Sequence, residues 1–336
     1  GGACRMSVLP DPAQPLSEEA AGAAFDAIFE DAADKDAIGA FLLALAARGE
    51  TAAEIAAAAR ALRARMVPVA APAGAIDVCG TGGDGSHSLN VSTAVAFVVA
   101  GAGVPVAKHG NRGASSRSGT ADVLIALGWE AEQTFERVEA CLEEVGIAFL
   151  FAQRHHPAMA KVAPIRKALG VRTIFNLLGP LANPAGVRRQ LVGVPAPRWA
   201  VPLADAALAL GAEAVVMVHG SGLDEVAVHA ESLLVRGEAG TGRGPLREEI
   251  IAPEMLGLAR HPREAVAGGA PEENAAELRA LFAGDGRPAY RDIVLANTAA
   301  ALTLTGLAWE DAIAAARASL ESGAAADRLA RFLAFR

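Results

Sequence analysis

Aromatic residues and cysteines are scarce in this chain of 336 residues. Phe, Trp and Tyr together make up 4% of it, whereas 52% of the residues are hydrophobic, so small aliphatic side chains must build the core. The three cysteines, Cys4, Cys79 and Cys141, share no C-x-x-C spacing, so neither a zinc knuckle nor a disulfide framework is predicted. This cysteine usage fits a reducing compartment, and we expect a cytoplasmic protein.

The chain also lacks an excess of positive charge and long apolar runs. Its net charge of −8 and pI near 5.5 argue against a sequence-independent nucleic-acid binder, which normally has a basic surface. No apolar run is long and uninterrupted enough to span a bilayer, and the opening GGACRMSVLP lacks the apolar core of a signal peptide. We therefore expect neither nucleic acid nor a membrane among its partners.

The first part of the chain has a helical pattern. Ser17 is a candidate N-cap before an alanine-rich run, and Thr51 with Glu54 forms a capping-box pattern before a second run. Residues 67–75, VPVAAPAGA, contain two prolines that break helices and indicate a hinge. The sequence predicts a small all-helical domain over residues 1–70, joined by part of 157–186, and a larger domain over 71–336.

The larger domain alternates between strand-like and helical runs. Such alternation predicts an α/β fold with a mainly parallel sheet covered by helices. The expected strands lie in residues 75–79, 104–108, 147–152, 190–194 and 212–220. One expected helix starts at residue 91, and the others cover residues 118–128, 134–146, 272–282, 291–306 and 309–323.

A glycine-rich stretch, GTGGDGSH, follows the first strand-like run of this domain. Glycines permit positive φ and close approach of a ligand to the backbone, and the helix that follows turns its N-terminus toward the same place. These features predict a site for an anion, with a plain glycine turn and a capped helix as the alternative. The glycines are Gly80, Gly82, Gly83 and Gly85, and the polar residues at the helix start are Asn90, Ser92 and Thr93.

The stretch KHGNRGASSRSGT, residues 108–120, follows the second strand-like run. The carboxyl edge of an open α/β sheet is where ligands bind, so its cations and hydroxyl groups favour an anionic ligand over the alternative of a solvated surface loop. The spacing is not that of a P-loop, because the lysine comes far after the glycines. The cations are Lys108, Arg112 and Arg117, and the hydroxyl groups belong to Ser115, Ser116, Ser118 and Thr120.

Two further stretches carry candidate functional groups. In HGSGLDEV, Asp224 and Glu225 are adjacent carboxylates that suit Mg²⁺ beside a phosphate site, unless they are a solvated pair after a turn. In RHHPAMAKVAPIRKALG, the guanidinium of Arg166 is able to grip a planar carboxylate, unless it is a surface residue of an amphipathic helix. His219 and His229 are too far apart for a zinc motif, and the FNLLGPLANPA stretch fits a structural linker.

Taken together and in this order, these motifs resemble anthranilate phosphoribosyltransferases, enzymes of the tryptophan pathway. The resemblance runs from about Ser17 to the C-terminus. It implies a small helical domain and a larger α/β domain of the kind seen in nucleoside phosphorylases and phosphoribosyltransferases. It also implies a homodimer formed through the small domains, and Mg²⁺. It also implies transfer of phosphoribose from phosphoribosyl pyrophosphate (PRPP) to the amine of anthranilate.

The resemblance also assigns roles to individual residues. Lys108 and Arg166 are implied to be catalytic, and Mg²⁺ is implied to bind Ser92, Asp224 and Glu225. Anthranilate is implied to contact Gly80, His109, Asn111, His156 and Arg166. The implied PRPP site consists of Gly80, Gly83, Asp84, Ser88, Asn90, Val91, Ser92, Thr93, Lys108, His109, Gly110, Asn111, Arg112, Gly113, Ala114, Ser115, Ser116 and Thr120.

The residues agree with this chemistry but leave two other functions open. An aromatic amine is a weak nucleophile, so the site must mainly stabilise departing pyrophosphate, which cations and backbone N–H groups do. A nucleoside phosphorylase would use the same glycine stretch for phosphate, although the KHGNR stretch with Arg166 favours an acidic aromatic acceptor. A non-enzymatic relative that binds nucleic acid is disfavoured by the negative net charge.

Overall fold

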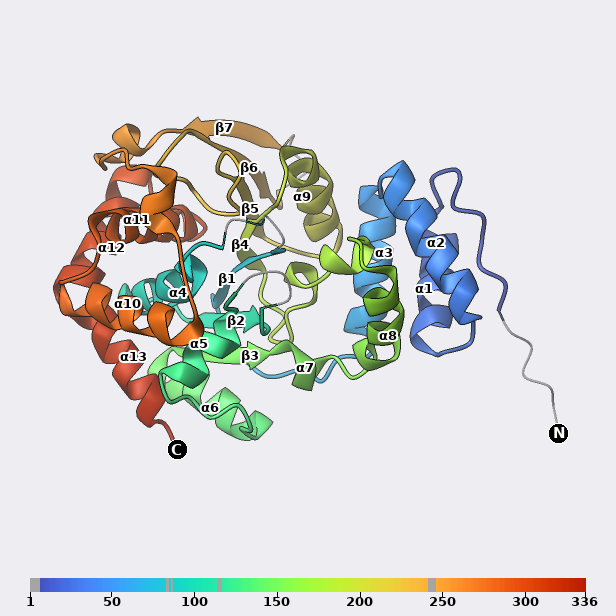
Figure 1. The fold of residues 1–336 in the computed structure, drawn as a ribbon, viewed down its shortest axis with the longest axis horizontal. Coiled ribbons are helices and arrows are strands. Elements are labelled where there is room, and N and C mark those ends of the chain that lie inside the picture. Colours follow the sequence, from blue (N-terminus) through green and yellow to red (C-terminus); the bar gives the residue numbers. More distant parts are fainter. Residues whose placement is uncertain (1–6, 83–84, 86, 114–116, 241–245) are drawn as a thin grey trace.

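The computed structural model describes residues 7–82, 85, 87–113, 117–240 and 246–336 (Figure 1). Three helices open the chain: α1 (Glu18–Phe29), α2 (Lys35–Arg48) and α3 (Ala52–Arg63). The Ser17 side chain accepts a hydrogen bond from the Ala20 N–H, and Thr51 with Glu54 closes a capping box, so both predicted helix starts are confirmed. Gly49, with φ of 91°, ends α2.

One seven-stranded sheet forms the centre of the larger part of the molecule, in the order β3-β2-β1-β4-β5-β6-β7. The first five strands along the chain run parallel, whereas β6 and β7 pair antiparallel, so the predicted mainly parallel sheet is confirmed. The strands are β1 (Ile76–Gly80), β2 (Val106–Gly110), β3 (Ile147–Phe151), β4 (Arg189–Gly193), β5 (Ala214–His219), β6 (Ser232–Glu238) and β7 (Arg247–Ile251).

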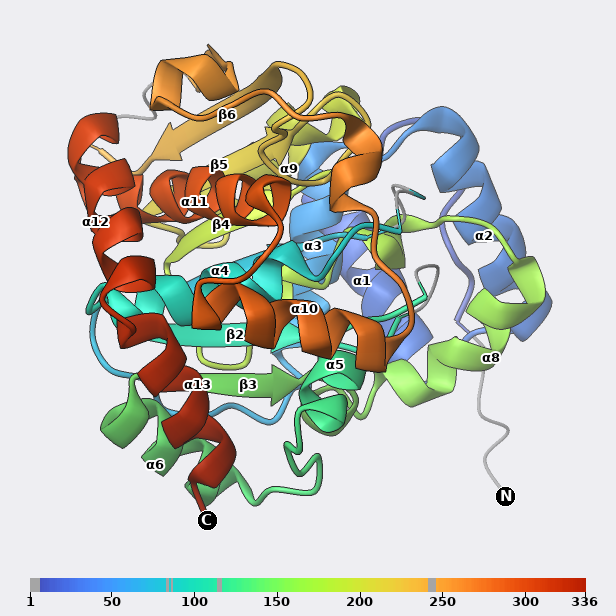
Figure 2. The same ribbon diagram turned by 60° about the vertical axis from the view of Figure 1, so that its left-hand side comes forward.

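Helices cover both faces of this sheet. On one face α4 (Val91–Gly101), apolar on all sides, contacts β1, β2 and β3, and α11 (Pro288–Thr303), α12 (Trp309–Glu321) and α13 (Ala324–Ala334) pack on its outer side (Figures 1 and 2). On the other face α9 (Ala200–Ala209) contacts β5 and β6, and α3 packs on α9. The other helices are α5 (Thr120–Ala126), α6 (Phe135–Val145), α7 (Ala152–His155), α8 (Met159–Leu169) and α10 (Pro271–Ala283).

Short 3₁₀ helices complete the secondary structure. They are η1 (Ile174–Asn176), η2 (Pro180–Ala182), η3 (Pro197–Trp199), η4 (Pro253–Leu256) and η5 (Arg263–Val266). Residues 67–75, expected to form a hinge, contain neither helix nor strand. Within the described residues, no helix combines the length and the apolar character that crossing a membrane requires.

The helices of the N-terminal part share a hydrophobic core with residues from the middle of the chain. The rings of Phe25 and Phe29 pack edge-on against Phe175, at centroid distances of 6.1 and 5.8 Å, and α8 contacts α1 and α2. From this packing we propose that residues 1–70, joined by part of 157–186, form the small domain and that the remainder of 71–336 forms the large one. The same core continues to Met217 of β5.

Candidate active site

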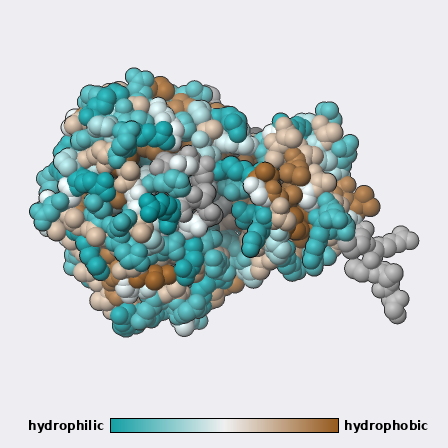
Figure 3. Space-filling view, viewed as in Figure 1, coloured by the Kyte–Doolittle hydropathy of each residue, from teal (hydrophilic) through white to brown (hydrophobic). Residues whose placement is uncertain are grey.

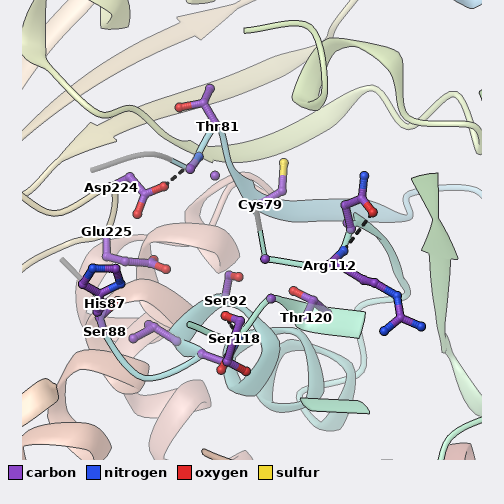
Figure 4. A pocket seen from close by; sticks show the side chains of 18 of the residues that line it. Cys79, Thr81, His87, Ser88, Ser92, Arg112, Ser118, Thr120, Asp224 and Glu225 are labelled. Atoms are coloured by element: carbon purple, nitrogen blue, oxygen red, sulfur yellow. Dashed lines mark hydrogen bonds between the residues drawn. The ribbon is translucent and has the colours of Figure 1, made fainter. Parts of the chain in front are cut away.

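A cavity of about 530 Å³ lies at the carboxyl ends of β1 and β2 (Figure 4). The chain proceeds from β1 to β2 and β3 on one side of β1 and then returns to β4 on its other side. Ligands bind beside such a reversal in open α/β sheets. The cavity is lined by segments that follow β1, precede α4, follow β2, precede α5, connect α8 to η1, and follow β5.

Two glycines let the segment that follows β5 lie against the ends of β1 and β4. Gly80 ends β1 and is paired in register with Gly193, which ends β4. A Cβ atom at Gly80 would overlap the Asp224 carboxylate, and one at Gly193 would overlap the Asp224 carbonyl oxygen. Gly82 has the expected positive φ, at 67°, but Gly80 does not, so the physical reason for glycine at position 80 is close packing.

Asp224 and Glu225 are half-buried at the wall of the cavity, near Ser92 (Figure 4). The Gly82 N–H donates to Asp224 Oδ2 at 3.1 Å, which ties the acidic pair to the glycine stretch. Two carboxylates and a hydroxyl are hard oxygen donors, so this set fits Mg²⁺. The described residues hold no cluster of three or more His, Cys, Asp or Glu able to bind a metal, and Mg²⁺ ordinarily completes such a site with substrate phosphates and water.

The N-terminus of α4 opens onto the same cavity. Asn90, Val91 and Ser92 line the cavity, and the Asn90 side chain does not cap the helix. Its Nδ2 donates to the Ser118 carbonyl at 3.2 Å, and its Oδ1 accepts from Asn274 Nδ2 at 2.8 Å. The positive end of the helix dipole and its N–H groups therefore face the cavity without a side-chain cap, which suits an anion.

Lys108 lies at the base of the cavity and is 3% exposed. Its Nζ donates to the Val78 carbonyl at 2.7 Å and to Ser92 Oγ at 3.2 Å, so the ammonium joins β1 to the start of α4. Burial lowers the pKa of Lys108, and the negative charge of Asp77 acts in the opposite direction. The predicted contact of Lys108 with phosphate stays a prediction, whereas its bond to Ser92 is a feature of this structure.

His109 and His156 form a buried pair at one side of the cavity. His109 Nδ1 lies 3.0 Å from the Gly179 carbonyl oxygen and must donate to it, so His109 Nε2 accepts from His156 Nε2 at 3.2 Å. Burial, assisted by the His156 ring, lowers the pKa of His109 to about 3. Burial, assisted by His155, lowers the pKa of His156 to about 4. Both rings are therefore neutral at pH 7.

A single carboxylate, that of Asp122, binds two backbone N–H groups of the stretch that follows β2. Asp122 Oδ2 accepts from the Gly113 N–H at 2.9 Å and from the Gly119 N–H at 3.0 Å, and its Oδ1 pairs with Arg112 Nη1 at 3.3 Å. A Cβ atom at Gly119 would overlap the Gly113 nitrogen. Asp122 therefore holds together Gly113 and Gly119, which both lie within the 108–120 stretch predicted to bind PRPP.

Arg166 lies near the end of α8 and Arg172 follows that helix, and the two side chains point to different places. The Arg166 guanidinium lies 5.9 Å from the centre of the Phe175 ring, and Arg166 is outside the set of described residues that line the cavity. Arg172 lies in that set, and its Nη1 donates to the Gly82 carbonyl at 2.8 Å. The segment between α8 and η1 thus reaches the glycine stretch through Arg172.

Models of two protein families match this chain. The helical bundle domain of a glycosyl transferase family matches residues 11–66, and the α/β domain of a glycosyl transferase family matches residues 73–326. Anthranilate phosphoribosyltransferase from Novosphingobium aromaticivorans is 51% identical over 95% of this chain and 96% of its own length. The enzyme of that name from Rhodospirillum rubrum is 52% identical over 96% of this chain and 92% of its own length. The chain belongs to the anthranilate phosphoribosyltransferase family.

Solved structures of family members have the same fold. Anthranilate phosphoribosyltransferase from Thermus thermophilus matches with a TM-score of 0.89 and 44% identity, over 96% of both chains. The Saccharomyces cerevisiae enzyme in complex with PRPP and Mg matches with a TM-score of 0.84 and 31% identity, over 95% of this chain and 93% of that one. A complex of the yeast enzyme with 4-fluoroanthranilate matches with a TM-score of 0.82 and 30% identity, over 95% of this chain and 92% of that one.

The structure gathers most of the residues that the family resemblance singled out. Thr93 lies beneath the cavity, where its hydroxyl donates to Thr120 Oγ1 at 3.3 Å, and His156 lies behind His109. Gly83, Asp84, Ala114, Ser115 and Ser116 lie outside the described residues. Those that line the cavity are Gly80, Ser88, Asn90, Val91, Ser92, Lys108, His109, Gly110, Asn111, Arg112, Gly113, Thr120, Asp224 and Glu225.

Sequence reasoning missed part of the cavity wall. Arg172 and Asn176 line the cavity, although the family-like stretch that contains Asn176 was interpreted as a linker. The available signal was an arginine and an asparagine among the hydrophobic residues of VRTIFN. Cys79, Leu89 and Val171 also line the cavity and give it apolar surface.

Proposed function

We propose that this protein is an anthranilate phosphoribosyltransferase, which transfers the phosphoribosyl group of PRPP to the amino group of anthranilate. In this reaction the bond between ribose C1 and pyrophosphate breaks, a bond from C1 to nitrogen forms, and the nitrogen loses a proton. The observation that carries the proposal is the convergence of three features on one cavity: the glycine end of β1, the uncapped start of α4 and the Asp224–Glu225 pair.

The residues around the cavity support stabilisation of the departing pyrophosphate. The amine of anthranilate is neutral and weakly nucleophilic, so the barrier lies mainly in breaking the bond to the leaving group. Fixed dipoles at the start of α4 lower this barrier without having to reorganise during the reaction. Lys108 contributes by holding Ser92 and by placing a positive charge at the base of the cavity.

Ser92, Asp224 and Glu225 are the residues proposed to hold Mg²⁺. When bound, the ion would neutralise negative charge on the pyrophosphate oxygens. Without a cation, the two carboxylates would repel the same oxygens. This electrostatic conflict supports the assignment of a divalent ion to this wall of the cavity.

The acceptor is proposed to bind where the two domains meet. Arg166 on α8 would supply the cation for the anthranilate carboxylate, and Asn111, His109 and Gly80 line the cavity. His156 keeps His109 in one orientation. A bidentate pair between arginine and carboxylate would fix the ring so that its amine faces ribose C1.

We also propose a cytoplasmic homodimer formed through the helical domains. Figure 3 shows hydrophobic side chains on the face of the helical lobe, and Leu43 of α2 is 42% exposed. Contiguous exposed apolar surface of this kind indicates a protein interface. Light scattering coupled to size-exclusion chromatography tests the dimer: a mass near twice the chain mass supports it, and the mass of one chain rejects it.

Loss of anthranilate fluorescence tests the proposed reaction. We expect the fluorescence to fall when the protein, PRPP and Mg²⁺ are all present and to remain constant when any one of them is omitted. Release of pyrophosphate in equal amount completes the test. Constant fluorescence with folded protein would contradict the proposal, and phosphorolysis of nucleosides in the same preparation would point to the phosphorylase alternative.

A further inference from the structure

Asn297 of α11 is a fully buried amide that lies outside the cavity but contacts the acidic loop, residues 220–228. Its Oδ1 accepts from the Val226 N–H at 2.7 Å. Its Nδ2 donates to the Val226 carbonyl at 2.9 Å and to the Ile293 carbonyl at 2.8 Å. Asn297 thereby pairs with both backbone polar groups of the residue that directly follows Glu225.

This two-point pairing fixes the orientation of the chain at Glu225. The Val226 N–H belongs to the peptide unit that includes the Glu225 carbonyl, and the Val226 carbonyl belongs to the next one. Rotation of either peptide plane would break a buried hydrogen bond and leave a polar group unpaired. Since a buried unpaired group is strongly unfavourable, the backbone from which the Glu225 side chain extends is held from behind by α11.

The rest of the acidic loop is fixed in a similar way. The Ala227 N–H donates to Ser232 Oγ at 2.8 Å, and Ser232 is fully buried. At the other end Gly220 and Leu223 exchange backbone hydrogen bonds of 2.9 and 3.2 Å. Asp224 and Glu225 lie between these two fixed points, so the backbone that carries the two carboxylates has little freedom to move.

Packing alone does not explain why an amide occupies position 297 of α11. Its neighbours Ile293, Leu295, Ala296 and Ala299 are buried and apolar, and an amide in such surroundings loses its hydration. Its hydrogen bonds to Val226 compensate this loss beside the acidic pair. A buried amide that orients a ligand-bearing segment acts as the outer-shell partners of metal sites do.

We propose that Asn297 is a positioning residue, which holds the Val226 backbone so that Asp224 and Glu225 present their carboxylates together to Mg²⁺ and PRPP. The proposal rests on the proposed function, because it needs the acidic pair to bind Mg²⁺. It predicts that a residue of α11 influences how much Mg²⁺ PRPP binding requires, although α11 supplies none of the described residues that line the cavity.

The test is the Mg²⁺ dependence of PRPP binding, measured by titration calorimetry on the full-length protein and on Asn297→Leu. Leucine has nearly the same shape but no hydrogen-bonding groups. We expect the Mg²⁺ concentration that gives half-maximal PRPP binding to rise about 10- to 100-fold. The anthranilate KM, measured at saturating Mg²⁺ and PRPP, should stay within about twofold of the wild type, because the acceptor site is built from other segments.

Thr298→Val is the matched control. Thr298 is the next residue of α11, is fully buried, and its hydroxyl has no hydrogen-bond partner among the described residues. Valine has nearly the same shape and removes only this unpartnered hydroxyl, so the Mg²⁺ dependence should not change. A shift in this variant as large as the shift in Asn297→Leu would overturn the specific role of Asn297.

The remaining outcomes are distinguishable. If the wild type binds no PRPP at any Mg²⁺ concentration, the proposed function itself fails. If the wild type binds PRPP and folded Asn297→Leu has the same Mg²⁺ dependence, only the positioning role fails. Asn297→Ala, which removes the amide without adding bulk, takes over the test if the leucine variant does not fold. If neither variant folds, Asn297 serves folding and the positioning role is rejected.

Discussion

Gly80 and Gly193 are partners in register at the carboxyl ends of β1 and β4, and Asp224 lies against both of them. The pair therefore leaves room for the loop that carries the acidic residues. At Gly80 the overlapping group would be the Asp224 side chain, which is able to rotate. At Gly193 the overlapping group would be the Asp224 backbone, which is not able to rotate away.

This difference predicts that Gly193→Ala is the more harmful substitution. The added methyl group must displace the backbone of the acidic loop, at a cost of about 1–3 kcal/mol in unfolding free energy, and PRPP binding should be lost with it. Gly80→Ala should weaken Mg²⁺-dependent PRPP binding with a smaller loss of stability. Urea unfolding and titration calorimetry measure the two effects.

Gly22→Ala is the control for both variants. Gly22 lies within α1, and a Cβ atom there would meet no atom within 4 Å, so alanine should stabilise the protein by about 0.5–1 kcal/mol. Equal stability losses at positions 80 and 193, or none at 193, would show that the acidic loop is not packed as described.

The acidic pair is predicted to set the requirement for Mg²⁺. Replacing Asp224 by Asn and Glu225 by Gln keeps the side-chain shapes but removes two negative charges, so the Mg²⁺ concentration for half-maximal activity should rise by at least about tenfold. The melting temperature should hardly change. The control is Glu310→Gln with Asp311→Asn, an exposed acidic pair at the start of α12, which removes the same charge elsewhere. An unchanged Mg²⁺ dependence in the first variant would refute the metal assignment.

The neutral histidine pair predicts a loss of stability in acid. In the unfolded chain both histidines have a pKa of about 6.5, whereas burial lowers the pKa of folded His109 to about 3 and that of His156 to about 4. Between these values the unfolded state binds more protons, so the free energy of unfolding falls as the pH decreases. The loss of stability begins below a pH of about 6.5 and grows, by up to about 1.4 kcal/mol per pH unit for each ring, down to a pH of about 4 for His156 and about 3 for His109.

His156→Gln isolates this contribution. Glutamine retains an amide that is able to donate to His109 but does not titrate, so the difference in stability between variant and wild type should shrink as the pH falls from about 7 to about 4. Urea unfolding at several pH values measures the difference. A difference that stays constant over this range would mean that His156 is not held neutral by burial.

Local signals in the sequence were sufficient to predict the helical start of the chain and most of the sheet. The capping box of Thr51 and Glu54 is formed within one helical turn, and β1 and β2 are short runs that end in glycine, so neither signal depends on distant contacts. β6 and β7 were not predicted as strands. Charged residues such as Arg236 and Glu249 interrupt their apolar pattern and pair with each other only across the finished sheet.

The candidate site was predicted where motifs are local and missed where they depend on the fold. The glycine stretch and the Asp224–Glu225 pair are visible in the sequence because their ligand chemistry is carried by adjacent residues. Arg172 and Asn297 lie in mostly apolar segments and form no motif with their neighbours, and only the tertiary structure brings them to Gly82 and Val226. Glycine at position 193 likewise has no local explanation, because its reason is the approach of the loop that follows the neighbouring strand β5.

Arg172 is predicted to affect PRPP more than anthranilate. Its hydrogen bond to the Gly82 carbonyl orients the glycine stretch, and Arg172→Ala removes it together with a positive charge at the cavity wall. We expect the PRPP KM to rise roughly tenfold, equivalent to ~1.4 kcal/mol. Arg198→Ala, which removes an exposed arginine outside the cavity lining, is the control for net charge. A PRPP KM equal to that of the control would assign Arg172 no role in the site.

Arg166 is predicted to affect the other substrate. It lies on α8 outside the cavity wall, above the Phe175 ring, so it reaches a ligand only at the domain junction, where the acceptor is proposed to bind. Arg166→Ala should raise the anthranilate KM and cost ~1.5–3 kcal/mol in kcat/KM for anthranilate, because a charge-assisted bidentate pair is lost, with little change in the PRPP KM.

Arg166→Lys should recover only part of this loss, since an ammonium keeps the charge but not the two-point geometry. Lys167→Ala, an exposed cation on the same helix, should leave both constants unchanged. If the PRPP KM rises more than the anthranilate KM in Arg166→Ala, Arg166 binds the pyrophosphate and the acceptor must bind elsewhere. If Arg166→Lys has full activity, the guanidinium contributes charge alone and does not orient the carboxylate.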